Sequence, residues 1–75
     1  MYSDLEKNKE VSLEAYQERV IRERADLEKK LSNLERFIDS PLFGEVKVAE
    51  GGRLFHQKAV MEEYIEVLTE RIDAF

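Results

Sequence analysis

The chain has 75 residues, of which 39% are charged and 43% hydrophobic, with a net charge of −5 at neutral pH and no cysteine. The core of a single domain of this length provides only a few kcal/mol of net stability. Without cysteine, no disulfide or thiolate metal site can add to that stability. We therefore expect a homo-oligomer. The negative charge argues against a long nucleic acid as the main partner, because such polyanions are held by a surplus of Lys and Arg.

Residues 1–11 carry many charges and little apolar periodicity, which is typical of a frayed end or a short separate helix. They lack the basic-then-apolar order of a signal peptide, and the chain has no apolar run long enough to span a bilayer. We therefore expect a single helical domain over residues 1–75 that is cytoplasmic and does not contact membranes.

The first long helix is predicted over residues 12–39. Ser12 is a favourable N-cap, and Glu14 lies in the first turn, where the helix dipole favours a negative charge. Pro41 pushes the residue before it out of the helical region, so the helix should end near Asp39. A heptad pattern typical of coiled-coil packing connects Leu13, Gln17, Val20, Arg24, Leu27, Leu31, Leu34 and Ile38.

The connection over residues 40–52 contains the only proline and all three glycines, which mark a clear break between two helices. It is too apolar for a bare linker, so we expect it to fold back over the end of the helices. The second helix is predicted over residues 53–73. Its heptad positions are Leu54, Lys58, Met61, Ile65, Leu68, Ile72 and Phe75.

These two apolar seams predict an all-α fold, an antiparallel helical hairpin that oligomerises into a helical bundle. One register gives nearly every seam residue an apolar partner. This agreement between the two helices is evidence for the hairpin in addition to the pattern of each helix by itself. It pairs Ile38 with Leu54, Leu31 with Met61, Leu27 with Ile65 and Val20 with Ile72, and it leaves Arg24 opposite Leu68 and Gln17 opposite Phe75.

Several polar residues have two interpretations each. Arg24 and Lys58 lie in the seams, where a buried unpaired charge is costly; they either extend their charged ends to solvent or line a pocket for a carboxylate or an anion. Gly51, Gly52 and Arg53 precede the predicted second helix. They either seat a phosphate at the helix N-terminus or only turn the chain, since no nucleotide fingerprint surrounds them.

Aromatic and basic residues are interleaved along the chain, either for packing in a core or interface or for stacking a nucleobase beside a phosphate. His56 is the only histidine, and no nucleophile or carboxylate stands at a catalytic spacing from it. We therefore predict a protein that is not an enzyme, with no cofactor. The candidate ligand-binding residues are Arg19, Arg24, Arg53, His56, Lys58 and Tyr64.

Glutamates make the second helix acidic, namely Glu62, Glu63, Glu66 and Glu70. A di-metal bundle would need an inward Glu-x-x-His pair, which is absent, so we predict no metal site and a solvated face.

A resemblance to known proteins runs from Arg19 to the end of the second helix and rests on Arg19-Val20, Glu23, Leu27, Leu31, Leu34, Phe37-Ile38, Ser40, Phe43, Gln57, Met61, Tyr64, Leu68 and Arg71-Ile72. Through these residues the chain resembles a family of small phage proteins named after a protein of a crAss-like phage. The resemblance implies phage origin and a place in the bacterial host cytoplasm, and it supplies no catalytic residue.

By analogy with other small helical phage proteins, the leading hypothesis is an oligomeric counter-defence protein that sequesters a bacterial cyclic nucleotide immune signal. One alternative is an acidic inhibitor that blocks the nucleic-acid-binding surface of a host defence complex, in the manner of an anti-CRISPR protein. A second alternative is a structural coiled coil for assembly.

Overall fold

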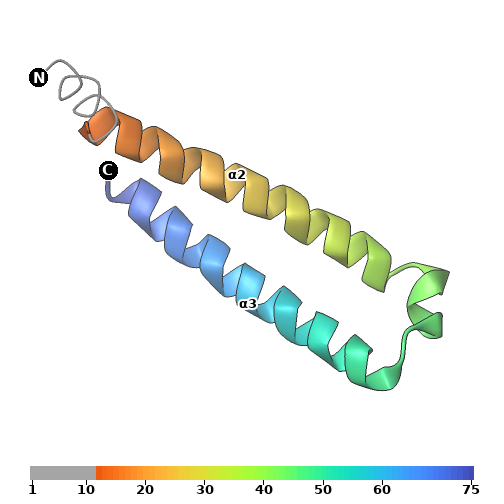
Figure 1. Cartoon of the computed structure of the whole chain (residues 1–75). Helices are drawn as coiled ribbons and strands as arrows, with labels where there is room; N and C mark the ends of the chain where they lie inside the picture. Colours follow the sequence, from red (N-terminus) through yellow and green to blue (C-terminus); the bar gives the residue numbers. More distant parts are fainter. Residues whose placement is uncertain (1–11) are drawn as a thin grey trace, which may run out of the picture.

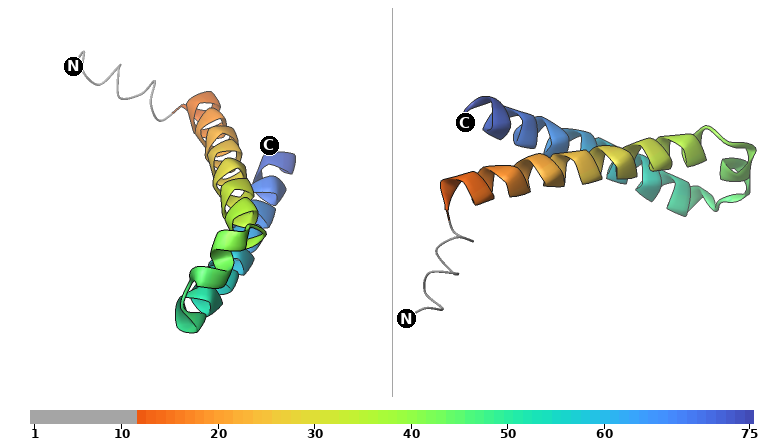
Figure 2. Two further views of the ribbon diagram at one scale, coloured as in Figure 1. Left: turned by 90° about the vertical axis from the view of Figure 1, so that its right-hand side faces the viewer. Right: turned by 90° about the horizontal axis from the view of Figure 1, so that it is seen from above.

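The computed structural model describes residues 12–75, which fold into two long antiparallel helices. Helix α2 spans Leu13–Ile38, the short 3-10 helix η1 spans Pro41–Glu45, and helix α3 spans Val48–Asp73. The N-terminal end of α2 and the C-terminal end of α3 lie together, opposite the loop (Figure 1), and the two helices cross at a shallow angle (Figure 2). The all-α helical hairpin is confirmed, whereas the expectation for residues 1–11 lies outside the described residues.

The ends of α2 follow from local hydrogen bonding. The hydroxyl of Ser12 accepts a hydrogen bond from the backbone N–H of Ala15 at 3.1 Å, so it caps the helix. At the other end the hydroxyl of Ser40 donates to the carbonyl oxygen of Phe37 at 2.7 Å. Pro41 then begins η1, as expected of a residue that favours the first position of a helix.

Helix α3 begins earlier than the sequence predicts. The expected start at Arg53 and the expected loop over 40–52 are wrong, because α3 starts at Val48 with Lys47 as its N-cap residue. The backbone N–H of Gly51 donates to the carbonyl oxygen of Lys47 at 2.8 Å, an ordinary first-turn helical bond. Gly51 and Gly52 are therefore part of the helix.

Packing of the loop against α3 explains why a glycine is accepted at the start of this helix. A Cβ atom on Gly51 would lie only 3.3 Å from Cζ of Phe43 in η1. The Phe43 ring stands edge-on to Phe55 of α3, with 5.5 Å between ring centroids, and edge-on to Phe37 of α2, at 6.2 Å. Edge-to-face pairs at these separations are favourable, so η1 closes the end of the hairpin as an aromatic cluster.

Side-chain contacts across the hairpin fit the predicted register. Arg24 hydrogen-bonds Thr69, the neighbour of its predicted partner Leu68. The Phe75 ring lies 6.1 Å from that of Tyr16, one residue from the predicted partner Gln17. Leu13 was predicted to lie in the apolar seam, but it is 70% exposed. Helix α3 ends at Asp73 and does not extend far enough along α2 to cover it.

The core between the helices is small. Among residues 12–75 the buried apolar side chains are Val20, Met61 and Leu68. Each contributes about 1.5–3 kcal/mol on burial, against the conformational entropy of ordering two long helices. The hairpin therefore leaves much apolar surface available to another molecule. Within the same residues, neither long helix has an apolar stretch that could cross a lipid bilayer.

Candidate functional site

An open groove of about 720 Å³ lies between α2 and one flank of α3. Most of its lining comes from α2, from residues three or four apart that share one side of the helix; α3 contributes two residues seven apart. The lining residues are Tyr16, Arg19, Val20, Arg22, Glu23, Asp26, Leu27, Lys30, Tyr64 and Arg71.

At the open end of the hairpin, Arg71 of α3 is held against Tyr16 of α2. Nη2 of Arg71 donates a hydrogen bond to the hydroxyl oxygen of Tyr16 at 2.5 Å. The guanidinium carbon lies 5.6 Å from the centroid of the same ring, within the range of a cation–π interaction. A positive charge and an aromatic surface are thus fixed side by side at this end of the groove.

Near the middle of the groove, Tyr64 of α3 reaches across to α2. Its hydroxyl donates a hydrogen bond to the carboxylate of Glu23. The bond orients the tyrosine ring, although Tyr64 as a whole remains 43% exposed. The ring of Tyr64 is therefore a second aromatic surface held in place on the groove wall. The carboxylate of Glu23 is already engaged by the tyrosine hydroxyl.

The groove is locally basic, although the chain is acidic. Four cationic side chains and two carboxylates line it, which leaves two more positive than negative charges in a chain whose net charge is −5. A concave surface with a surplus of one charge attracts counter-ions. Together with the two tyrosine rings, the groove suits a small anion that contains a planar ring. The basic residues are Arg19, Arg22, Lys30 and Arg71, and the acidic ones are Glu23 and Asp26.

Comparison with protein families matches residues 14–74, both long helices and the loop between them, to the family named Sequestin. The chain belongs to the Sequestin family. The family name suggests a binding protein that sequesters its ligand. Neither the curated proteins nor the solved structures contain a match to the chain. The match shows a family of binding proteins over the stretch where the sequence predicted one, whereas the family named after a crAss-like phage protein and the phage origin stay predictions.

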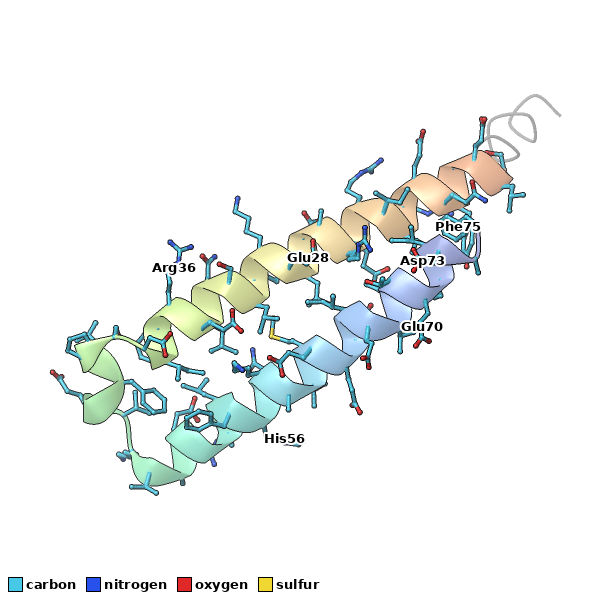
Figure 3. The ribbon with its side chains drawn as sticks, turned by 180° about the vertical axis from the view of Figure 1, so that it is seen from behind. Glu28, Arg36, His56, Glu70, Asp73 and Phe75 are labelled. Atoms are coloured by element: carbon cyan, nitrogen blue, oxygen red, sulfur yellow. The ribbon has the colours of Figure 1, made fainter. Side chains whose placement is uncertain are left out.

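The six residues predicted to bind a ligand lie at separate places on this Sequestin-family chain. Arg19 and Tyr64 line the groove. Arg53 is exposed near the start of α3, where its Nε lies 2.8 Å from a carboxylate oxygen of Glu50. His56 points away from α2 (Figure 3) and lines a separate shallow depression on α3 with acidic neighbours. These residues do not form one pocket.

Arg24 and Lys58 lie at the opposite edge of the hairpin, half-buried, with their charged ends paired. Nη1 of Arg24 donates to the hydroxyl of Thr69 at 3.1 Å. Nζ of Lys58 lies 3.0 Å from a carboxylate oxygen of Glu62 and 3.8 Å from one of Glu35. The hydrogen bond and charge of Glu62 raise the pKa of Lys58. These contacts favour packed stems with charged ends at the surface over a buried anion pocket.

Neither interpretation of Gly51, Gly52 and Arg53, a phosphate seat or a turn of the chain, fits the structure. Both assumed that these residues precede the helix, whereas α3 starts at Val48. The N–H of Gly51 already donates to Lys47 within the helix, so it is not available to a ligand. Among residues 12–75 there is also no group of three or more His, Cys, Asp or Glu side chains suited to hold a metal ion.

Several lining residues of the groove are not among the six candidate ligand-binding residues predicted from the sequence, namely Tyr16, Arg22, Lys30 and Arg71. The predicted register contains a signal that would have found two of them. Pairing Val20 with Ile72 puts the flanking residues Tyr16 and Arg71 on the same face, because equivalent flanks of antiparallel helices face the same side. Arg22 and Lys30 have no such signal, since they read as ordinary solvated residues of α2.

Proposed function

We propose that this chain is a phage counter-defence protein that sequesters a bacterial cyclic nucleotide immune signal in the groove between α2 and α3. The observation that carries the proposal is the pairing of two oriented tyrosine rings with a surplus of cationic side chains in one groove. Membership of the Sequestin family supports a sequestering role. The protein acts by binding alone, as a homo-oligomer in the cytoplasm of the infected bacterium, without catalysing a reaction.

Each part of such a ligand has a matching group in the groove. Tyr16 and Tyr64 offer ring faces on which a nucleobase stacks, an interaction that tolerates different bases. Arg71 and Arg22 offer guanidinium groups, which bind phosphate oxygens through paired hydrogen bonds. The carboxylate of Asp26, on the same wall, is available to accept a hydrogen bond from a ribose hydroxyl or a base amine.

Thermal unfolding in the presence of a panel of cyclic di- and trinucleotides tests the proposal. A ligand at a hundred times its Kd adds about 2.7 kcal/mol to the free energy of unfolding, so a member of the panel should raise Tm by several degrees. Native mass spectrometry should then show the intact ligand bound and recovered without change. If no cyclic nucleotide raises Tm, or if the ligand is converted, the proposal is wrong.

A matched pair of variants connects the effect to the groove. Arg22→Ala removes a groove cation and should weaken binding about tenfold, as expected for loss of one charged hydrogen bond. Arg36→Ala removes the same charge from an exposed site on α2 outside the groove, where Arg36 bonds only its neighbour Asn33 among the hydrogen bonds described, and should leave affinity unchanged. Equal losses in both variants would indicate non-specific charge attraction.

The acidic outer face of α3 offers a direct test of the rival inhibitor role. Glu63, Glu66 and Glu70 are exposed, and Glu70 points away from α2 (Figure 3). Replacing the three with Lys should leave nucleotide binding intact if the groove is the functional site. If the same variant instead abolishes capture of a nucleic-acid-binding host complex, and no nucleotide binds the native chain, the inhibitor role replaces the proposal.

A further inference from the structure

Helix α3 carries an apolar stripe beside the row that packs against α2, and within it only the hydroxyl of Tyr64 reaches α2, at Glu23. Val60, Tyr64 and Val67 are 48%, 43% and 51% exposed, respectively, and their spacing of four and three residues aligns them along one side of the helix. Buried Met61 and Leu68 make up the neighbouring row that faces α2. Because Tyr64 also lines the groove, the stripe and the groove open on the same face of the hairpin.

The stripe is the apolar centre of a second heptad row that runs along α3 beside the first and is polar toward both ends. A surface helix with one packing partner has one apolar side and a polar remainder, so exposed apolar residues beside the packed row indicate a second neighbour at the centre of α3. The small core between α2 and α3 points the same way. The second row consists of Arg53, Gln57, Val60, Tyr64, Val67 and Arg71.

We propose that this stripe binds a second copy of the chain, with α3 packed antiparallel against α3 of the partner across a two-fold axis beside Tyr64. The contact itself does not depend on the proposed function. Its consequence for the groove rests on that function, because the partner turns an open groove into half of a shared cleft.

The pattern of the stripe favours a second copy in the antiparallel orientation. A two-fold contact requires a surface that is complementary to itself, and the stripe reads almost the same in both directions around Tyr64. Antiparallel packing places Val60 opposite the partner's Val67 and brings the two tyrosines together at the axis. Parallel packing would instead place Arg53 and Arg71 each beside its own copy, and like charges at an interface are unfavourable.

The antiparallel arrangement also joins the two binding grooves. The two-fold axis stands perpendicular to the plane that contains the two paired α3 helices. It reverses the direction of α3 but leaves α2 and the partner's α2 on the same side of that plane. The grooves then face one another over a floor made by the paired α3 helices. A groove on one hairpin contacts a ligand from one side, whereas small-molecule sites bury about 70–90% of the ligand surface. The partner supplies the missing wall.

The shared cleft concentrates positive charge from both copies. Each groove has a surplus of cationic over anionic side chains, so the apposed grooves repel one another until an anion lies between them. A contact through a single pair of 26-residue helices is also at the small end of stable interfaces. Binding of a cyclic dinucleotide in the cleft should therefore strengthen the dimer.

Sedimentation velocity over a range of protein concentrations tests the interface. The native chain should form a dimer whose fraction rises with concentration and with added cyclic dinucleotide. Val60→Glu should give a monomer that remains helical by circular dichroism. Ile21→Glu, the same charge change at a residue 47% exposed on α2, should still dimerise. A native chain that stays monomeric at every concentration overturns the inference, whatever else covers the stripe.

Cysteine cross-linking tests the orientation without depending on the stability of a charged variant, because the native chain has no cysteine. Mixed Val60→Cys and Val67→Cys chains should oxidise to the heterodimer, and neither alone should cross-link efficiently. Efficient cross-linking of Val60→Cys to itself would show parallel packing and overturn the inference. The outcomes separate the two proposals. A cross-linked dimer that binds no cyclic nucleotide refutes only the function, and a monomer that binds one refutes the interface and the homo-oligomer but not the sequestration of the nucleotide.

Discussion

The guanidinium of Arg71 donates a hydrogen bond to the hydroxyl of Tyr16 and lies beside its ring, which ties the last turn of α3 to the start of α2. Phe75 also packs against Tyr16, with 6.1 Å between the two ring centroids. The aromatic cluster of Phe37, Phe43 and Phe55 closes the opposite end of the hairpin. The small core between the helices is thus fastened at both ends by aromatic side chains.

Arg71→Ala should therefore loosen the open end of the hairpin. It removes a charged hydrogen bond and a cation–π contact, which together are worth about 1 kcal/mol at a partly exposed site. Tyr16→Phe, which keeps the ring and removes only the hydroxyl, should cost about half as much. Urea unfolding followed by circular dichroism measures both. An Arg71→Ala chain as stable as the native one would show that the contact contributes nothing.

The two helical glycines offer a matched pair of substitutions. Both lie in α3 and neither has a positive φ, so alanine should gain about 1 kcal/mol in helix propensity at each. Nothing lies within 4 Å of a Cβ on Gly52, whereas one on Gly51 meets Cζ of Phe43 at 3.3 Å. Gly52→Ala should raise Tm by several degrees, and Gly51→Ala should raise it by less or lower it. Equal gains would show that Phe43 does not constrain the turn.

The same glycine pair shows where prediction from the sequence fails. The register between α2 and α3 could be predicted because heptad spacing records, residue by residue, which side of each helix is apolar. The start of α3 could not, because a glycine pair is unfavourable locally, and the packing of Phe43 that favours a glycine at position 51 is visible only in the structure. At such positions tertiary packing outweighs helix propensity.

The groove was only partly predictable for a related reason. Tyr64 and Arg19 were selected because aromatic and basic residues together suit a nucleotide. Arg22 and Lys30 look like solvated surface in the sequence and become part of a site only when a second helix lies beside them. Arg24 and Lys58 were selected because they interrupt the seams, and the structure instead pairs both at the opposite edge.

The raised pKa of Lys58 predicts a dependence of stability on alkaline pH. The hydrogen bond and charge of Glu62 raise this pKa above its ordinary value of 10.5. The protonated form is therefore favoured by folding, and its contribution is complete below 10.5 and lost as pH rises through the folded-state pKa. Lys58→Met should flatten the fall in Tm above pH 10.5, whereas Lys30→Met should not. Parallel curves for the native and Lys58→Met chains would contradict this.

Arg24→Leu should change the stability of the hairpin without changing its affinity for a ligand. Arg24 lies half-buried opposite Leu68, where its guanidinium bonds a single described partner, the hydroxyl of Thr69. Replacing a partly buried charge by an apolar side chain of suitable size is often stabilising, and Thr69 can then bond water at the edge of the hairpin. We expect an increase of about 1 kcal/mol in the free energy of unfolding, read from the urea midpoint at constant m-value.

Because Arg24 lies outside the groove, the affinity of the Arg24→Leu chain for a cyclic nucleotide should be unchanged. A large loss of affinity in a stabilised Arg24→Leu chain would mean that the ligand binds at the edge of the hairpin that carries Arg24 and Lys58.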